Sequence, residues 1–152
     1  MKNKMGFTLV ELLAVISILS ILMGLAYMGV SRYLNKARNA TYEDFEVSIE
    51  DAVNNYLIDH SGDIPNEGEY YKIEVAKLIC EGYLDSLEDP ANSSKTCNSD
   101  SYALIYRGED TSFNMDVGSG TCLKCSKYKS PFCTNGITPT RTLKAASTCK
   151  VR

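Results

Sequence analysis

Six cysteines and one histidine are the residues of this 152-residue chain whose types could support chemistry beyond packing. Cys122 and Cys125 have the spacing of zinc-binding and redox-active cysteine pairs. A zinc site needs further ligands nearby, yet Cys133 and Cys149 are 16 residues apart and His60 is remote in the sequence. We therefore favour structural disulfides over a metal site or a redox centre, and we expect no metal and no cofactor.

All of the cysteines follow the apolar N-terminal segment. An even number of cysteines in such a position is typical of an exported domain, because disulfides persist outside the cytosol. Spacing alone leaves the connectivity open. Our working prediction is one bridge between Cys80 and Cys97, with the last four cysteines pairing among themselves. The disulfide candidates are Cys80, Cys97, Cys122, Cys125, Cys133 and Cys149.

The sequence does not contain a recognisable set of catalytic residues. One histidine at the end of a predicted helix cannot supply a Ser/His/Asp arrangement, and no glycine-rich phosphate loop occurs. We therefore expect that the protein is not an enzyme and that it has no catalytic residues.

Glu11 is the one ionisable residue in an apolar run of 24 residues, from Phe7 to Val30. As a helix, this run would be roughly 36 Å long, enough to cross a hydrocarbon core of roughly 30 Å. A carboxylate at bilayer depth costs about 2.5–3.5 kcal/mol even on the lenient insertion scale. The run predicts a single membrane span in which Glu11 needs a compensating partner.

The stretch around Glu11 reads KMGFTLVELL, residues 4–13. It resembles the class III signal of type IV pilins and pseudopilins, in which a short basic leader ends in glycine. In that family a prepilin peptidase cuts after the glycine, the new N-terminal residue is N-methylated, and the fifth mature residue is a glutamate. The resemblance implies a leader of residues 1–6, cleavage between Gly6 and Phe7, and N-methylation of Phe7.

The cut would create a positive charge at Phe7, which suggests a partner for Glu11. Two opposite charges attract strongly in a low-dielectric medium, and this attraction offsets part of the desolvation cost of each. We expect Phe7 of one subunit and Glu11 of a neighbour to act together in subunit assembly. Two alternatives are that Glu11 pairs with its own N-terminus and that its side chain snorkels to the membrane surface.

The apolar run differs from many family members because it contains no proline. Gly24 and Gly29 are its weakest helix formers. They are candidates for loosening the helix during assembly, or they only allow close helix contact. A cleaved secretory signal ending near Gly24-Leu25-Ala26 and a plain signal anchor are competing interpretations of the segment, but neither explains Glu11.

The elements that would position these residues follow from periodicity. Apolar residues keep helical spacing beyond Val30, and no proline occurs from Phe7 to His60, which predicts one helix of about 54 residues, roughly 80 Å long. Residues 70–87 suit a short helix, and residues 101–106 and 112–117 suit an antiparallel hairpin.

The predicted class is α+β and pilin-like: a long N-terminal helix packed on a small antiparallel sheet, with a disulfide-tied C-terminal region. The predicted divisions are a leader (1–6), a transmembrane and filament-core helix half (7–30), and a soluble head (31–152) made of an amphipathic helix half (31–60), a loop with a short helix (61–100), and a sheet with a cysteine-rich region (101–152).

Charge is distributed unevenly. Residues 61–118 hold 12 acids and 4 bases, whereas residues 119–152 hold no acid and 7 bases. The basic part could present a surface to DNA or an anionic cell-wall polymer, but we favour internal balance with the acidic part. A second pattern lies on the long helix, where we predict that basic and acidic bands pair between subunits: Arg32, Lys36 and Arg38 against Glu43, Asp44, Glu46, Glu50 and Asp51.

The sequence thus predicts a structural subunit of a type IV pilus or a type II secretion-like pseudopilus, polymerised through its N-terminal helix. Lys2 and Lys4 favour a single-pass precursor with its N-terminus inside, which later enters an extracellular or envelope-spanning filament. The family implies prepilin peptidase, other pilin subunits, a membrane platform and an assembly ATPase as partners. The filament could serve adhesion, motility, DNA uptake or secretion. The sequence also leaves open whether the chain is a major or a minor subunit. The alternative is a membrane-anchored extracellular binding or sensory protein that stays monomeric.

Overall fold

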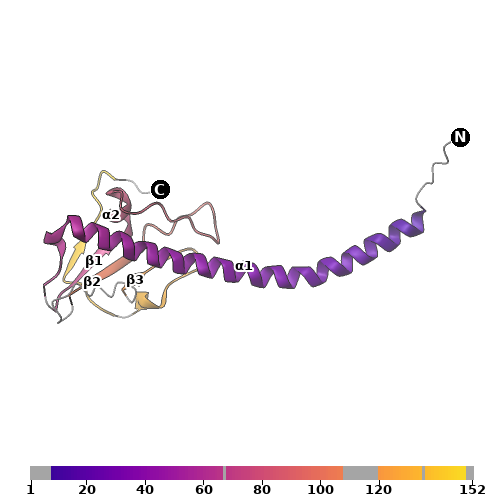
Figure 1. The fold of residues 1–152 in the computed structure, drawn as a ribbon, viewed down its shortest axis with the longest axis horizontal. Coiled ribbons are helices and arrows are strands. Elements are labelled where there is room, and N and C mark those ends of the chain that lie inside the picture. The colour runs from indigo at the N-terminus through magenta and orange to yellow at the C-terminus, as the bar shows by residue number, and fades with distance from the viewer. Residues whose placement is uncertain (1–7, 67, 108–119, 135, 150–152) are drawn as a thin grey trace. The chain divides into compact units, whose positions relative to one another are not determined.

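A computed structural model of the chain describes residues 8–66, 68–107, 120–134 and 136–149 (Figure 1). The chain divides into two compact units, Met1–Asn39 and Ala40–Arg152. The helix α1 (Leu9–Asp59) has its first part in one unit and its second part in the other. This confirms the prediction of one long N-terminal helix.

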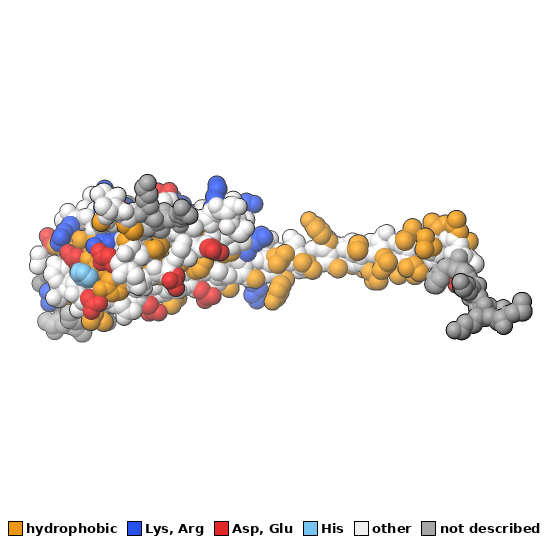
Figure 2. Space-filling view, turned by 90° about the horizontal axis from the view of Figure 1, so that it is seen from above, with side chains coloured by type: hydrophobic (Ala, Val, Ile, Leu, Met, Phe, Trp, Pro, Cys, Tyr) orange, Lys and Arg blue, Asp and Glu red, His pale blue; other side chains and the backbone are white. Residues whose placement is uncertain are grey.

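The first unit is described from Thr8 onward and consists of the part of α1 up to Asn39, which is mostly apolar. Its large apolar side chains are exposed along the length of the helix, and Figure 2 shows them as orange atoms on the face in view. Within the described part of the chain, α1 is the one helix long and apolar enough to cross a membrane. A helix that is apolar all round needs lipid or other helices to cover it.

The second unit begins with the amphipathic part of α1. Its inward side chains recur at a spacing of three or four residues, as expected for one face of a helix, and they form much of the core. They lie against the sheet, which α1 crosses in Figure 1. The buried residues on this face are Tyr42, Ile49, Ala52, Val53, Tyr56 and Leu57.

The sheet of the second unit has the strand order β3-β2-β1-β4. Strand β1 (Tyr70–Glu74) pairs antiparallel with β2 (Tyr102–Tyr106), which pairs antiparallel with β3 (Thr121–Cys122). Strand β4 (Arg141–Leu143) pairs parallel with β1. The predicted antiparallel sheet is therefore wrong at this edge, and the sheet is mixed. A parallel neighbour requires a long connection, and β4 is reached only after the chain has passed through β2 and β3.

Two of the predicted local elements need correction or comment. The segment predicted as a helix over residues 70–87 begins as strand β1, and only α2 (Val75–Cys80) is helical. Tyr70, Tyr71 and Ile73 suit a pleated surface, and pairing with β2 decides in favour of a strand. The predicted strand at 101–106 is confirmed as β2, whereas the predicted strand at 112–117 lies outside the described residues.

All six cysteines form disulfides, which confirms their structural role. The predicted Cys80–Cys97 bridge is wrong, and of the last four cysteines only Cys122 and Cys133 pair with each other as predicted. The bridges are Cys80–Cys149, Cys97–Cys125 and Cys122–Cys133. Cys122 and Cys125 belong to different bridges, so the closely spaced pair is divided between two partners. The bridges link segments that are 69, 28 and 11 residues apart, and contacts over such separations follow from the fold rather than from spacing.

Candidate processing and assembly site

The N-terminus of α1 is closed by a reciprocal set of hydrogen bonds between Thr8 and Glu11. The Thr8 backbone N–H and hydroxyl donate to Glu11 Oε2 at 3.1 and 3.0 Å, and the Glu11 backbone N–H donates to Thr8 Oγ1 at 3.3 Å. This is a capping box, in which the first residue and the acid three positions later satisfy each other's exposed donors. The Thr8-x-x-Glu11 spacing was a sequence signal for it that our prediction did not use.

The capping box gives Glu11 a partner within its own subunit. Helix N-termini leave backbone N–H groups unsatisfied and carry a partial positive charge, both of which favour a carboxylate there. Only Oε2 takes part, and no donor from the described residues reaches Oε1. The second oxygen is thus available to a donor from elsewhere.

The predicted cleavage and methylation residues cannot be placed against this capping box. Gly6 and Phe7 lie outside the described residues. Cleavage between them, N-methylation of Phe7 and its pairing with Glu11 of a neighbour therefore remain predictions. The structure contributes the conformation of the residues that directly follow, with Thr8 preceding the helix and Glu11 in its first turn.

Polar side chains inside the apolar run bond back to the helix. Ser17 Oγ donates to the Leu13 carbonyl at 2.8 Å, and Ser20 Oγ donates to the Ile16 carbonyl at 2.7 Å. These bonds satisfy both hydroxyls locally. The helix therefore offers a nearly uniform apolar surface to whatever surrounds it.

Helix α1 continues through Gly24 and Gly29 without a break. Nothing lies within 4 Å of the position that a Cβ atom would take at either glycine. Neither glycine therefore accommodates a close neighbour from the described part of the chain. Helix loosening and close contact with a second helix both stay predictions for these positions.

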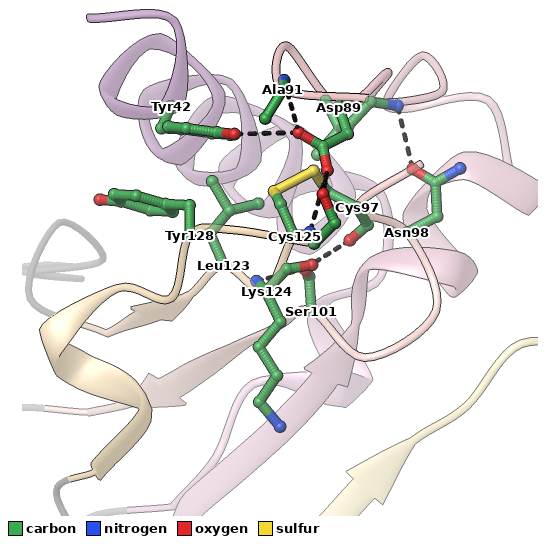
Figure 3. The surroundings of a disulfide bond; sticks show 12 residues. Tyr42, Asp89, Ala91, Cys97, Asn98, Ser101, Leu123, Lys124, Cys125 and Tyr128 are labelled. Carbon is green, nitrogen blue, oxygen red and sulfur yellow. Dashed lines mark hydrogen bonds between the residues drawn. A yellow bond between two sulfur atoms is a disulfide. The ribbon is translucent and has the colours of Figure 1, made fainter. Parts of the chain in front are cut away.

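In the second unit, a buried carboxylate joins three segments (Figure 3). Asp89 Oδ1 accepts hydrogen bonds from the Tyr42 hydroxyl at 2.9 Å and the Ala91 N–H at 2.8 Å. Asp89 Oδ2 accepts from the Ser126 N–H at 2.9 Å and from the Ser126 hydroxyl. Burial by itself raises the pKa of Asp89, but the hydrogen bonds from Ser126, Ala91 and Tyr42 outweigh it and lower the pKa to about 2. Asp89 was not among the residues predicted to have a role, because Tyr42 and Ser126 lie 47 and 37 residues away in the sequence.

Tyr128 packs the cysteine-rich region onto α1. Its ring stacks on Tyr42 with centroids 4.3 Å apart, and its hydroxyl donates to Glu46 Oε1 at 3.0 Å. Burial and the Glu46 carboxylate raise the pKa of Tyr128 to about 12. The Tyr128 ring is thus already stacked within the chain and is not a free stacking group for the bases of a nucleic acid.

Arg141, in the basic C-terminal part, is balanced by an acid. Its guanidinium lies 3.3 Å from Asp63 Oδ1 and over the Tyr71 ring, 5.6 Å from the centroid. This ion pair between the basic and the acidic parts of the chain is the kind of contact that internal charge balance predicts. A polyanion-binding surface in the basic part stays the less favoured alternative.

His60 lies directly after α1, as predicted. Its ring stacks on Tyr56 at 4.3 Å, and Nε2 is 4.0 Å from Glu81 Oε2. The described residues contain no group of three or more histidine, cysteine or acidic side chains placed to hold a metal ion.

Comparison with known proteins agrees with these features. Residues 1–27 match the family described as the prokaryotic N-terminal methylation motif. The "ComG operon protein 3 homolog" of Bacillus licheniformis is 29% identical over 82 residues, which cover 54% of this chain and 76% of that protein. No solved structure matches the chain. The class III signal and the apolar helix fit a membrane-anchored precursor, and the methylation motif, the long helix and the disulfide-tied α+β head confirm the resemblance of this chain to type IV pilins and pseudopilins.

Proposed function

We propose that the chain is a structural subunit of a type IV pilus or of a pseudopilus, with no catalytic role. In this proposal it is inserted as a single-pass precursor with its N-terminus inside. Prepilin peptidase cuts after Gly6, Phe7 is N-methylated, and the subunits polymerise through the apolar part of α1. The filament lies outside the cell membrane or spans the envelope.

The observation that carries this proposal is the exposed apolar surface of α1 in the first unit. Leu9, Ile18, Met23 and Leu25 are between 59% and 75% exposed, and the large apolar side chains around them are exposed as well. A contiguous surface of this kind is found where lipid or partner helices cover it. In the precursor the cover is lipid, and in a filament it is the same helix of neighbouring subunits.

In a filament, each of the two oxygens of the Glu11 carboxylate then has its own partner. Oε2 stays in the capping box with Thr8, and Oε1 accepts a hydrogen bond from the methylated ammonium of a neighbour's Phe7. A carboxylate held in position by its own helix loses little additional freedom on binding, and this preorganisation favours assembly. The resemblance also implies a membrane platform and an assembly ATPase as partners.

The test compares Glu11→Gln with Glu11→Ala in the full-length precursor. Glutamine keeps a side-chain oxygen for the capping box but lacks the charge, whereas alanine lacks both. We expect both variants to insert into the membrane and to be cut after Gly6, as read by mass spectrometry of the N-terminus. Filament yield, measured by shearing and sedimentation, should fall at least tenfold in both.

Two results would oppose the proposal. If Glu11→Gln formed normal filaments, the charge of Glu11 would not be needed for assembly. A wild-type chain that keeps Met1 and never sediments as a filament would favour the alternative of a monomeric, membrane-anchored binding or sensory protein.

A further inference from the structure

The end of the apolar run of α1 and the residues directly after it carry three cations and two tyrosines. We call residues 27–38 the collar; they lie entirely within the first unit. All of its described side chains are exposed, with Tyr27 at 78% and Tyr33 at 73%. Figure 2 shows blue basic side chains following the orange apolar ones along the helix. The cations are Arg32, Lys36 and Arg38.

One side of the collar is hollowed into a groove of about 150 Å³. Its polar lining is a row one helical turn apart, formed by Ser31, Asn35 and Arg38. Its apolar lining is Val30 and Leu34, with Tyr27 at the N-terminal end. No hydrogen bond or ion pair joins Ser31, Asn35 or Arg38 to another side chain in the described ranges, so their donors are available.

The donors of the groove match a phosphate group. A hydroxyl, an amide and a guanidinium follow one another, and arginine binds phosphate oxygens through two parallel N–H groups. The groove lining contains no carboxylate, and the sequence has no acid between Glu11 and Glu43. The apolar lining beside the donors favours a phosphate that is attached to an apolar chain over a free inorganic ion.

The location of the collar along α1 favours a lipid as the source of that phosphate. The apolar run is roughly 36 Å long as a helix, compared with a hydrocarbon core of roughly 30 Å, so the collar follows the core into the headgroup layer. Tyrosine is enriched at that depth. Cations on the outer side of a span oppose the usual preference for positive charge inside, and an anionic ligand there explains their presence. This step depends on the proposed membrane-anchored precursor.

We propose that the collar is a binding site for anionic phospholipid. Ser31, Asn35 and Arg38 donate to the headgroup phosphate, while Val30 and Leu34 contact the glycerol and the first methylene groups. Arg32 and Lys36 lie on other sides of the helix and attract further anionic headgroups. The bound lipid holds the precursor at a defined depth, and it must be released when the subunit leaves the membrane.

The test uses the full-length chain in nanodiscs that contain phosphatidylglycerol and phosphatidylcholine in equal amounts. Native mass spectrometry after detergent release counts the lipids that stay bound. We expect the wild type to retain phosphatidylglycerol in preference to phosphatidylcholine. Arg38→Gln should reduce this retention roughly tenfold, the ratio expected for one lost charge-assisted contact, and Arg38→Lys should reduce it less. Lys95→Gln removes an exposed lysine of the second unit and should change nothing.

Several results would overturn the proposal. Equal retention of the two lipids, or unchanged retention in Arg38→Gln, would exclude a site for anionic lipid in the groove. If millimolar inorganic phosphate displaced the lipid completely, the ligand of the groove would be a free anion and not a phospholipid. If Arg38→Gln lost filaments but retained lipid normally, the partner of Arg38 would be the acidic band on α1 of a second copy and not a lipid. Glu11→Gln separates this proposal from the proposed function, because it should lose filaments while retaining phosphatidylglycerol.

Discussion

The two units of this chain bury their apolar residues in opposite ways. In the first unit, one helix satisfies its own backbone, caps its own N-terminus, and leaves its apolar side chains exposed. In the second unit, α1, a mixed sheet and three disulfides enclose a core in which Ile49, Tyr56 and Ile73 are fully buried. The apolar surface of the first unit needs lipid or other helices to cover it, whereas the second unit is stabilised by its own contacts.

The same contrast appears in the two carboxylates that organise the units. Glu11 accepts hydrogen bonds from Thr8, three residues away. Asp89 accepts them from Tyr42, Ala91 and Ser126, two of which are 47 and 37 residues away. Local bonds leave a carboxylate ready for an external partner, while long-range bonds use it to join the parts of one domain.

The largest expected difference between the units is a loss of stability that is confined to the second unit. It should follow from removing the disulfide that closes the longest loop. Replacing Cys80 and Cys149 by serine opens a link between residues 69 positions apart. The chain-entropy model assigns about 4 kcal/mol to such a bridge and about 3 kcal/mol to a short one. We expect the free energy of unfolding of the second unit to fall by about 4 kcal/mol, as measured by urea denaturation in detergent with near-UV circular dichroism.

A matched variant uses the shortest loop. Replacing Cys122 and Cys133 by serine opens a link over 11 residues, so its loss should be smaller. Membrane insertion should be unchanged in both variants, because the first unit contains no cysteine. A defect in insertion would show that the two units do not act separately.

The next effect tests the buried carboxylate of the second unit. Asp89→Asn keeps the shape of the side chain but removes the charge and replaces one acceptor oxygen by a donor that faces other donors. Hydrogen bonds to a charged group contribute about 1.5–3 kcal/mol, so we expect a loss of about 3 kcal/mol in the same denaturation experiment. Asp85→Asn, at an exposed position of the same region, serves as the control and should change little.

Asp89 also predicts a dependence on pH. Its pKa is lowered from 3.8 to about 2 in the folded chain. A carboxyl with a lowered folded pKa stabilises the fold above its unfolded pKa, and this contribution is lost as pH falls through the folded value. The stability difference between the wild type and Asp89→Asn should therefore be constant near neutral pH and shrink between about pH 4 and pH 2. A constant difference down to pH 2 would contradict the assignment.

The smallest effect belongs to the first unit. Thr8→Ala removes the capping hydroxyl of α1, whereas Thr8→Ser keeps it. Loss of an N-cap side chain costs about 1 kcal/mol, and we expect faster hydrogen exchange at the amides of residues 9–12 in Thr8→Ala only. Unfolding of the second unit should be identical in both variants. Equal exchange in the two variants would mean that Thr8 does not cap the helix.

The sequence alone was sufficient where the interacting residues are close together along the chain. The apolar run, the uninterrupted helix from Leu9 to Asp59 and the class III signal around Gly6 and Glu11 are recognisable within a few residues of each position. The capping box was recognisable in the same way. Helical spacing also identified most of the face of α1 that is buried in the second unit.

Only the tertiary structure decided which distant segments meet. The parallel pairing of β4 with β1, the strand at Tyr70–Glu74 in place of a helix, the three disulfide partners and the hydrogen bonds from Tyr42 and Ser126 to Asp89 all depend on distant residues brought together by the fold. Sequence spacing carries no record of such contacts, because a long loop can close on many partners at nearly the same entropic cost. Packing against the core then selects one of them, whereas a helix turn or a cap is decided by its immediate neighbours.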